Sequence, residues 1–438
     1  MVVVSVRTPC RADTGNLDSA ARGKSGSRHI GQAPHFGGLR ISGKTDDFLI
    51  LPGHRVHSST GNPNAVRQRV VGESDLKVSS TQALDEIPAP ELPWLPPRAP
   101  QPIPGIGLIG CGGITAYHLD AYRDAGFPVL AFCDVDEDRA SGRRDTYNPS
   151  GAVYADYVTL LAHPGIEVVD IATHVEVRGA MIEAALRAGK HVLSQKPFTL
   201  DLAEGERLIA LAEERNLKLA VNQNGRWAPH FSYMRQAIAA GVIGEVNAVH
   251  LAVHWDHAWT ETTVFNDIPH LILYDFAIHW FDMLTCFMGD TAPLRVFASE
   301  ARTARQTNKP PMLGQVIVEY PNAQATLVFD AATKFGATDH SFIAGTLGTL
   351  QSTGPDLSHQ AVTLYNEHGI ARPALTGEWF KNGFEGTMAE LLCAIAENRP
   401  PANSARNNLR SLALCFAAIE SARSHQPQVP GNIRRMPN

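Results

Sequence analysis

Two short segments of the chain carry the residue types that proton transfer at an alcohol or carbonyl group requires. One is Ser194-Gln-Lys-Pro197, in which Lys196 can donate a hydrogen bond to a reacting oxygen. The other runs from Asp275 to His279, so that a histidine follows a carboxylate by one helical turn. A histidine whose second nitrogen is held by a carboxylate can accept an alcohol proton near neutral pH. Because residues four apart on a helix share a face, we expect Asp275 and His279 to project into one cleft.

Each of these residues also has a plainer interpretation. Lys196 could be a solvated lysine at the end of a strand, although Pro197 fixes the turn that follows it. Asp275 and His279 could form a surface ion pair, but the apolar residues that surround them, such as Trp280, disfavour an exposed position.

A glycine-rich turn, Gly110-Cys-Gly-Gly-Ile-Thr115, follows an apolar strand and precedes a helical pattern. Glycines there let backbone N–H groups approach a pyrophosphate at the N-terminus of a helix. Asp134 stands at the end of the next strand, where a carboxylate accepts ribose hydroxyls and repels a 2′-phosphate. We expect NAD as cofactor, with NADP left open by the nearby Arg139. The predicted cofactor contacts in this region are Gly110, Gly112, Gly113, Ile114 and Asp134.

Alternating strand and helix patterns surround these motifs. Between residues 103 and 224 they predict a doubly wound parallel sheet, a Rossmann dinucleotide-binding domain. Longer alternating runs between residues 225 and 438 predict a second α/β domain with an open, largely antiparallel sheet. The expected strands are 105–109, 129–133, 167–171, 191–194 and 217–221 in the first domain, and 246–255, 314–320, 325–329 and 361–365 in the second.

Residues 1–102 have a different composition. They lack a sustained apolar period and end in eight prolines between Pro88 and Pro104, so we expect a disordered tail and an extended linker, with order beginning near Ile103. The formal charge of −6 disfavours nucleic acid as a partner, and no apolar run is long enough to predict a membrane span. The six cysteines are scattered, as is typical of a cytoplasmic protein.

Several motifs together resemble the glucose-fructose oxidoreductase and inositol dehydrogenase (Gfo/Idh/MocA) family. The resemblance extends from about Ile103 to His425. It implies NAD(P)-dependent hydride transfer to or from a sugar or polyol, with Lys196 bonding the reacting oxygen and Asp275 with His279 relaying the proton. It also implies a homo-oligomer, a dimer or tetramer, formed through the open sheet. The matching segments are Gly110–Ile114, Ile171–Thr173, Ala188–Leu193, Lys196-Pro197, Arg226 with Pro229, and Asp275-x-x-x-His279-x-x-Asp282.

The chain departs from the family pattern at two places. Gln195 replaces the usual glutamate before the lysine, which removes a negative charge beside Lys196. Thr173-His174 replaces Thr-Pro, and Arg178 occupies a position where histidine is usual. We still expect Thr173, Gln195 and Lys196 to contact the cofactor.

Residues after the last strand of the Rossmann domain are candidates for substrate binding. They are Asn224, Arg226 and Trp227, together with His254 on a later strand. His254-Trp-Asp-His257 could suggest a metal site, but alternation along a strand separates its two histidines, so we expect no metal. Asp282 is expected to act as a structural bridge. Two alternatives remain open: an NAD-dependent glycoside hydrolase that oxidises its substrate transiently, and a non-catalytic dinucleotide-binding regulator.

Overall fold

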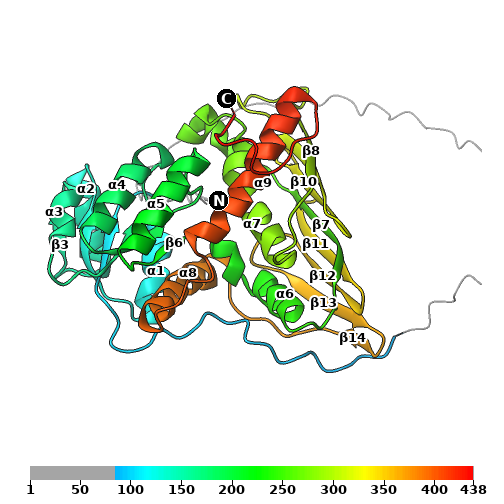
Figure 1. Cartoon of the computed structure of the whole chain (residues 1–438), viewed down its shortest axis with the longest axis horizontal. Helices are drawn as coiled ribbons and strands as arrows, with labels where there is room; N and C mark the ends of the chain where they lie inside the picture. The colour runs from blue at the N-terminus through cyan, green and yellow to red at the C-terminus, as the bar shows by residue number, and fades with distance from the viewer. Residues whose placement is uncertain (1–83, 438) are drawn as a thin grey trace, which may run out of the picture. The chain divides into compact units, whose positions relative to one another are not determined.

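The computed structural model describes residues 84–437, so residues 1–83 of the tail and linker predicted for residues 1–102 lie outside the described residues. A six-stranded sheet and an eight-stranded sheet organise this part of the chain, and helices pack against both (Figure 1). The helices are α1 Thr115–Ala125, α2 Glu137–Tyr147, α3 Tyr157–Leu161, α4 Val175–Arg187, α5 Leu202–Glu214, α6 Pro229–Ala239, α7 Ile278–Phe287, α8 Trp379–Ala396 and α9 Ala405–Ser424.

The first sheet has the strand order β3-β2-β1-β4-β5-β6, and every neighbouring pair is parallel. This order places β1 and β4 side by side at its centre, which is the doubly wound arrangement that the sequence predicts. β1 is buried at all four residues because helices cover both faces of the sheet. The strands are β1 Ile106–Ile109, β2 Val129–Cys133, β3 Ala152–Tyr154, β4 Val168–Ile171, β5 His191–Ser194 and β6 Leu219–Val221.

The strand register brings the functional loops to one edge of this sheet. Ile109 lies beside both Cys133 and Ile171, and Ile171 lies beside Ser194. The residues that follow these strands therefore meet at the carboxyl edge, where ligands bind in such sheets. They include the glycine turn and Lys196.

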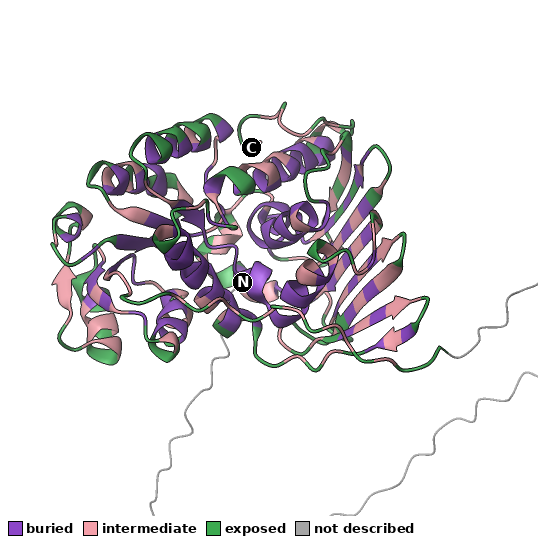
Figure 2. Cartoon of the chain, turned by 60° about the horizontal axis from the view of Figure 1, so that its bottom comes forward, coloured by how far each residue is buried: buried purple, intermediate pink, exposed green. Residues whose placement is uncertain are grey.

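The second sheet is antiparallel except for the pair β7 and β10, as the sequence analysis expected. Burial alternates along its strands, which Figure 2 shows as bands, because helices cover one face and leave the other open. Its strands are β7 Val246–His254, β8 Arg295–Ala301, β9 Leu313–Glu319, β10 Gln324–Asp330, β11 Thr338–Gly345, β12 Gly348–Gly354, β13 Ala361–Asn366 and β14 Gly369–Ala371.

The proline-rich segment 84–102 is part of the folded structure, and the expectation that order begins near Ile103 is wrong. It runs along the lower edge in Figure 1. Ile87 donates a backbone hydrogen bond to Ile370 at 2.8 Å, and Ser232 Oγ donates one to the carbonyl of Trp94 at 2.6 Å. Ile87, Leu92 and Trp94 pack against the main hydrophobic core. Extended proline-rich chain has few backbone donors of its own to satisfy, so apolar side chains between the prolines can fix it by packing.

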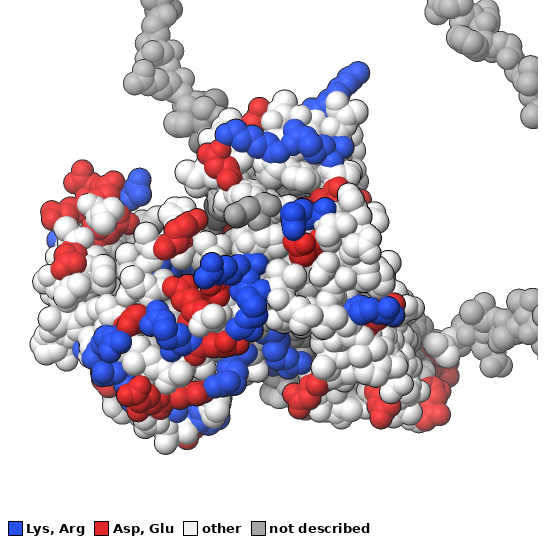
Figure 3. All heavy atoms as spheres, turned by 45° about the horizontal axis from the view of Figure 1, so that its top comes forward, with Lys and Arg blue, Asp and Glu red and all other residues white. Residues whose placement is uncertain are grey.

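Helix α8 packs against the first domain, although it lies near the C-terminal end of the chain. Phe384, Met388 and Leu392 of α8 are buried against apolar residues of α1 and of the parallel sheet. On the outside, Lys and Arg are interspersed with Asp and Glu (Figure 3). Exposed ion pairs of this kind, such as Arg207 with Glu183 at 2.7 Å, contribute little individually.

Candidate active site

The glycine turn offers a cradle that fits a dinucleotide pyrophosphate. Gly110 has φ of +92°, and a Cβ there would lie 2.9 Å from the backbone of Ala172, so this position requires glycine. A Cβ on Gly112 or Gly113 would meet nothing within 4 Å, so their backbone borders open space. No acidic residue lies in the first turn of α1, whose N-terminus faces this turn. These features suit an anionic group.

Asp134 lies directly beside this cradle. Its Oδ2 accepts the backbone N–H of Cys111 at 2.8 Å, and its Oδ1 accepts that of Asp136 at 3.0 Å. Both contacts hold the carboxylate at the rim of the turn, where a ribose diol would donate to it. Arg139 pairs with Asp136 at 3.1 Å, so the nearby cation already has a carboxylate partner. Ile114 is partly buried and packs under the start of α1.

Lys196, which follows strand β5 of the parallel sheet, forms an ion pair with Asp275, which precedes helix α7. Lys196 Nζ donates to the backbone carbonyl of Asp275 at 2.9 Å and to its Oδ2 at 3.1 Å. Both side chains are 11% exposed, so the pair is largely shielded from water and yet reachable. Asp275 lies in a π-helical turn, Ile272–Phe276, immediately before α7. Such turns are frequent at functional sites because they reorient side chains within a helix.

His279 lies in the first turn of α7, close enough to Lys196 to be affected by its charge. Burial lowers the pKa of His279 well below its usual value, and the positive charge of Lys196 lowers it further. The imidazole is therefore neutral at pH 7 and able to accept a proton. Its Nδ1 is buried without a hydrogen-bond partner among the described residues, and the Asp275 carboxylate bonds Lys196. The expected hydrogen bond between Asp275 and His279 is not formed among the described residues, because the Asp275 carboxylate is paired with Lys196.

A buried polar network lies behind Lys196. Gln195 Oε1 accepts the backbone N–H of Lys196 at 2.8 Å, and Gln195 Nε2 lies 3.0 Å from His118 Nε2. His118 Nδ1 in turn lies 2.7 Å from Asp170 Oδ2, which also accepts the hydroxyl of Tyr122 at 2.8 Å. These distances assign the proton of His118 to Nδ1, so that Nε2 accepts from the glutamine amide. The network holds the loop that carries Lys196.

Arg178 ties together the ends of two strands. Its guanidinium donates to the carbonyl of Thr173 after β4 and to those of Gln195 and Pro197 after β5. Burial lowers its pKa to about 10, which leaves it charged at neutral pH. Thr173 lies next to the glycine turn, with its methyl group 3.1 Å from where a Cβ on Gly110 would stand.

Sequence analysis missed the roles of His118 and Arg178. The sequence does contain one sign of the role of His118, because the charged residue Asp170 interrupts the apolar strand Val168–Ile171. A carboxylate inside a fully buried strand needs a partner from a neighbouring element.

Three of the predicted substrate residues have structural partners. Asn224 Oδ1 accepts the indole N–H of Trp379 at 3.1 Å, and the Trp379 ring lies edge-on to His279 with 5.8 Å between centroids. Arg226 is clamped by Asp282 at 2.6 and 2.7 Å, so Asp282 is the structural bridge that was expected. Trp227 is buried. These residues support the wall behind His279.

His254 is not brought to this site. It lies on the open face of the second sheet, where its Nδ1 lies 2.7 Å from Asp330 Oδ2. The neighbouring Trp255 and the nearby His257 are buried on the side of the core, as strand alternation predicts. The expectation that His254 lines one pocket with Asn224, Arg226 and Trp227 is therefore wrong.

Comparisons with known proteins agree with this geometry. The sequence profile of the oxidoreductase family with an NAD-binding Rossmann fold matches residues 105–223, and that of the GFO/IDH/MocA C-terminal domain matches residues 231–351. The chain belongs to the Gfo/Idh/MocA oxidoreductase family. It is accordingly an NAD-binding oxidoreductase.

Several relatives align with most of this chain. D-Apiose dehydrogenase of Paraburkholderia graminis is 27% identical over 346 residues, which cover 72% of this chain and 87% of that protein. Inositol 2-dehydrogenase of Rhizobium meliloti is 24% identical over 329 residues, covering 72% and 96%. An Agrobacterium radiobacter oxidoreductase, whose crystal structure contains NAD+, L-tartaric acid and magnesium, superimposes with a TM-score of 0.66 at 23% identity, covering 75% and 98%.

Proposed function

We propose that this protein oxidises a hydroxyl group of a sugar, a polyol or a related compound with NAD as hydride acceptor, or catalyses the reverse reduction. The observation that carries the proposal is the meeting of Lys196, Asp275 and the neutral His279 at the carboxyl edge of the parallel sheet. The named dehydrogenases of apiose and inositol among its relatives act on compounds of this class.

Each residue has a distinct part in this reaction. A bound nicotinamide would take up the hydride during oxidation and supply it during reduction. The ammonium of Lys196 donates a hydrogen bond to the substrate oxygen and stabilises the charge that develops on it. Neutral His279 accepts the hydroxyl proton during oxidation and returns it during reduction. Asp275 holds Lys196 in place through its carboxylate and its carbonyl.

Further contacts support cofactor binding and choice. Gly110, Gly112, Gly113 and Ile114 would hold the pyrophosphate, and Thr173, Gln195 and Lys196 would border the nicotinamide half. Asp134 would accept the ribose hydroxyls and favour NAD over NADP.

We also propose a homo-oligomer that works in the cytoplasm. The open face of the eight-stranded sheet supports assembly, because apolar side chains such as Ile317, which is 47% exposed, stand on it. Within the described residues, no helix is long and apolar enough to cross a membrane.

A substrate screen tests the proposed reaction. The purified protein is mixed with NAD or NADP and with inositols, aldoses, sugar acids or glycosides, and cofactor reduction and glycoside cleavage are recorded in parallel. The proposal predicts cofactor reduction in step with formation of a ketone or lactone. Glycoside cleavage without net cofactor change, or cofactor binding without turnover of any compound, would contradict it.

A further inference from the structure

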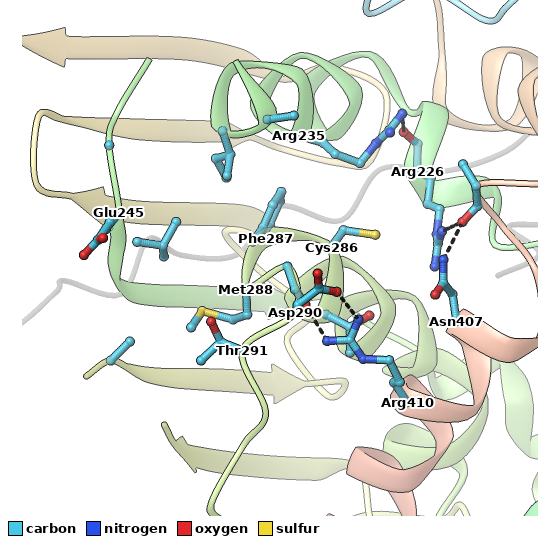
Figure 4. Close-up of a pocket in the computed structure, with 18 of the residues that line it drawn as sticks. Arg226, Arg235, Glu245, Cys286, Phe287, Met288, Asp290, Thr291, Asn407 and Arg410 are labelled. Carbon is cyan, nitrogen blue, oxygen red and sulfur yellow. Dashed lines mark hydrogen bonds and ion pairs between the residues drawn. The ribbon is translucent and has the colours of Figure 1, made fainter. Parts of the chain in front are cut away.

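A cavity of about 780 Å³ lies in the second domain (Figure 4), and neither the glycine turn nor Lys196 lines it. It opens between α6, the end of α7 and α9. His279 stands near the start of α7, and Cys286, which lines the cavity, stands near its end. Seven residues of helix separate the two by about 10 Å along the axis. The cavity is large enough for a small molecule and is not part of the active site.

Three arginines line this cavity, and they differ in how far their charge is compensated. Arg226 is fully paired with Asp282 and belongs to the wall behind His279. Arg410 donates to the carbonyl of Gly289, and its ion pair with Asp290 is loose, at 4.0 Å from a carboxylate in open solvent. Figure 4 shows Arg226 and Arg410 on the same side of the cavity.

Arg235 has no carboxylate partner among the described residues. Its Nε is buried without a hydrogen-bond partner, and one terminal nitrogen makes only a long contact, 3.4 Å, to the carbonyl of Arg226. Its guanidinium lies 5.5 Å from the ring centroid of Trp227. Burial lowers the pKa of Arg235, which measures how poorly its charge is solvated. A buried cation without a counter-ion is costly, and an anion in the cavity would remove that cost.

Two acidic residues line the cavity: Asp290, which makes the loose pair with Arg410, and Glu245. Glu245 is exposed and lies across the cavity from Arg226 and Arg410 in Figure 4. Asparagine and threonine side chains, among them Asn407 and Thr285, add neutral hydrogen-bonding groups to the lining. Guanidinium groups bind carboxylates and phosphates with paired, charge-assisted hydrogen bonds.

We propose that this cavity binds a small molecule through a carboxylate or phosphate group, which is held by Arg235 and Arg410. The ligand occupies a site separate from those of substrate and cofactor. Arg226 shares the cavity wall, and through Asp282 it contacts the same helix that carries His279, so a bound anion touches the support of the active site.

Isothermal titration of the full chain with citrate and with inorganic phosphate tests the proposal. The titrations are made at constant ionic strength and with saturating NAD, because the glycine turn would otherwise bind anions itself. We expect one saturable site for at least one of the two anions, and the anion that binds identifies the group recognised. Absence of saturable binding for both would overturn the proposal. Titrations repeated without NAD separate this outcome from a failure of cofactor binding.

Three variants locate the site. Arg235→Met keeps the aliphatic stem without the charge, and Arg410→Gln removes the second guanidinium. Each should weaken anion binding at least about tenfold, the value of one charge-assisted hydrogen bond. The matched control is Arg406→Gln on the same helix, where an exposed arginine pairs with Glu213, and it should leave the affinity unchanged. Unchanged affinity in both cavity variants, or equal weakening in the control, would overturn the proposal.

Cysteine protection provides a second measurement if Arg235→Met fails to fold. Cys286 is the one described cysteine that is not fully buried, and it lines the cavity. Alkylation of Cys286 by a neutral reagent, followed by peptide mapping, should slow when the anion binds the wild type and should not slow in Arg410→Gln. Equal rates with and without the anion in the wild type would count against the site.

Discussion

Replacing Gln195 by glutamate should make the stability of the protein depend on pH in a new way. The amide of Gln195 donates to His118 Nε2, and His118 donates from Nδ1 to Asp170. A carboxylate at position 195 has no proton to donate, so two acceptors would face each other at about 3.0 Å. His118 and Asp170 are 0% exposed, and water cannot easily separate the pair.

The free energy of unfolding should fall by about 1–3 kcal/mol, the cost of losing one buried hydrogen bond and leaving its acceptor unsatisfied. For a protein of this size a loss of 1 kcal/mol lowers Tm by about 2–4 °C, so we expect a decrease of about 2–12 °C at pH 8.5. In the variant, a proton taken up between the two carboxylates as the pH falls would restore a donor to the network. The loss of stability should therefore be fully present at high pH and shrink as the pH falls.

Thermal unfolding followed by circular dichroism at pH 5.5 and 8.5 measures both effects. Gln315→Glu, at an exposed position of β9, is the matched control for one added negative charge and should change Tm little at either pH. Equal Tm differences between wild type and Gln195→Glu at the two pH values would refute the assignment of the His118 proton. A variant as stable as the wild type at pH 8.5 would refute the network itself.

Three further predictions follow from other parts of the structure. The dissociation constant for NAD should be lower than that for NADP, and Asp134→Ser should bring the two dissociation constants closer together. Tighter binding of NADP than of NAD by the wild type would contradict the role of Asp134. A chain that begins at Ile103 should melt several degrees below one that begins at Ala83, because it lacks the apolar contacts of Ile87, Leu92 and Trp94; equal melting would mean that the segment 84–102 adds no stability. Burial raises the pKa of Asp339 from 3.8 to about 8, so the destabilisation caused by its buried charge grows as the pH rises between these two values. Asp339→Asn should therefore stabilise the protein at pH 7.5 by on the order of 2–5 kcal/mol and hardly at all near pH 4. The same Tm for the variant and the wild type at pH 7.5 would contradict this.

Much of the fold could be predicted because burial on both faces of the parallel sheet leaves an unbroken apolar run. The strands Val129–Cys133 and His191–Ser194 are found at the predicted residues for this reason. The strand Ala152–Tyr154 was not predicted, since it has three residues and all are only partly buried. The packing of segment 84–102 was missed because a proline-rich composition does not reveal which apolar side chains will find a core.

The site could be predicted as a set of residues, whereas its hydrogen bonds could not. Lys196 and Asp275 are in direct contact, and His279 lies near enough to Lys196 for its pKa to be lowered by the lysine charge. The spacing of Asp275 and His279 suggested a shared helix face, but a π-helical turn contains Asp275 and directs its carboxylate to Lys196. His254 was assigned to the pocket because a single sequence shows the alternation along a strand but does not identify which face is covered.

Hydride transfer in single-residue variants tests the account of the active site most directly. NAD reduction is measured between pH 5 and 10 with a substrate found by the screen, and NAD affinity is measured separately. Lys196→Met should lower turnover by a factor on the order of 10² or more with NAD affinity nearly unchanged, whereas Lys218→Met, at a half-buried lysine that bonds Asn398, should leave both unchanged. His279→Ala should be as slow as Lys196→Met. It should also lose the acidic limb of the pH profile of NAD reduction, which the lowered pKa of His279 places below pH 6.5 in the wild type. Equal and small losses in the Lys196 and His279 variants, with folding intact, would contradict the assignment of the active site.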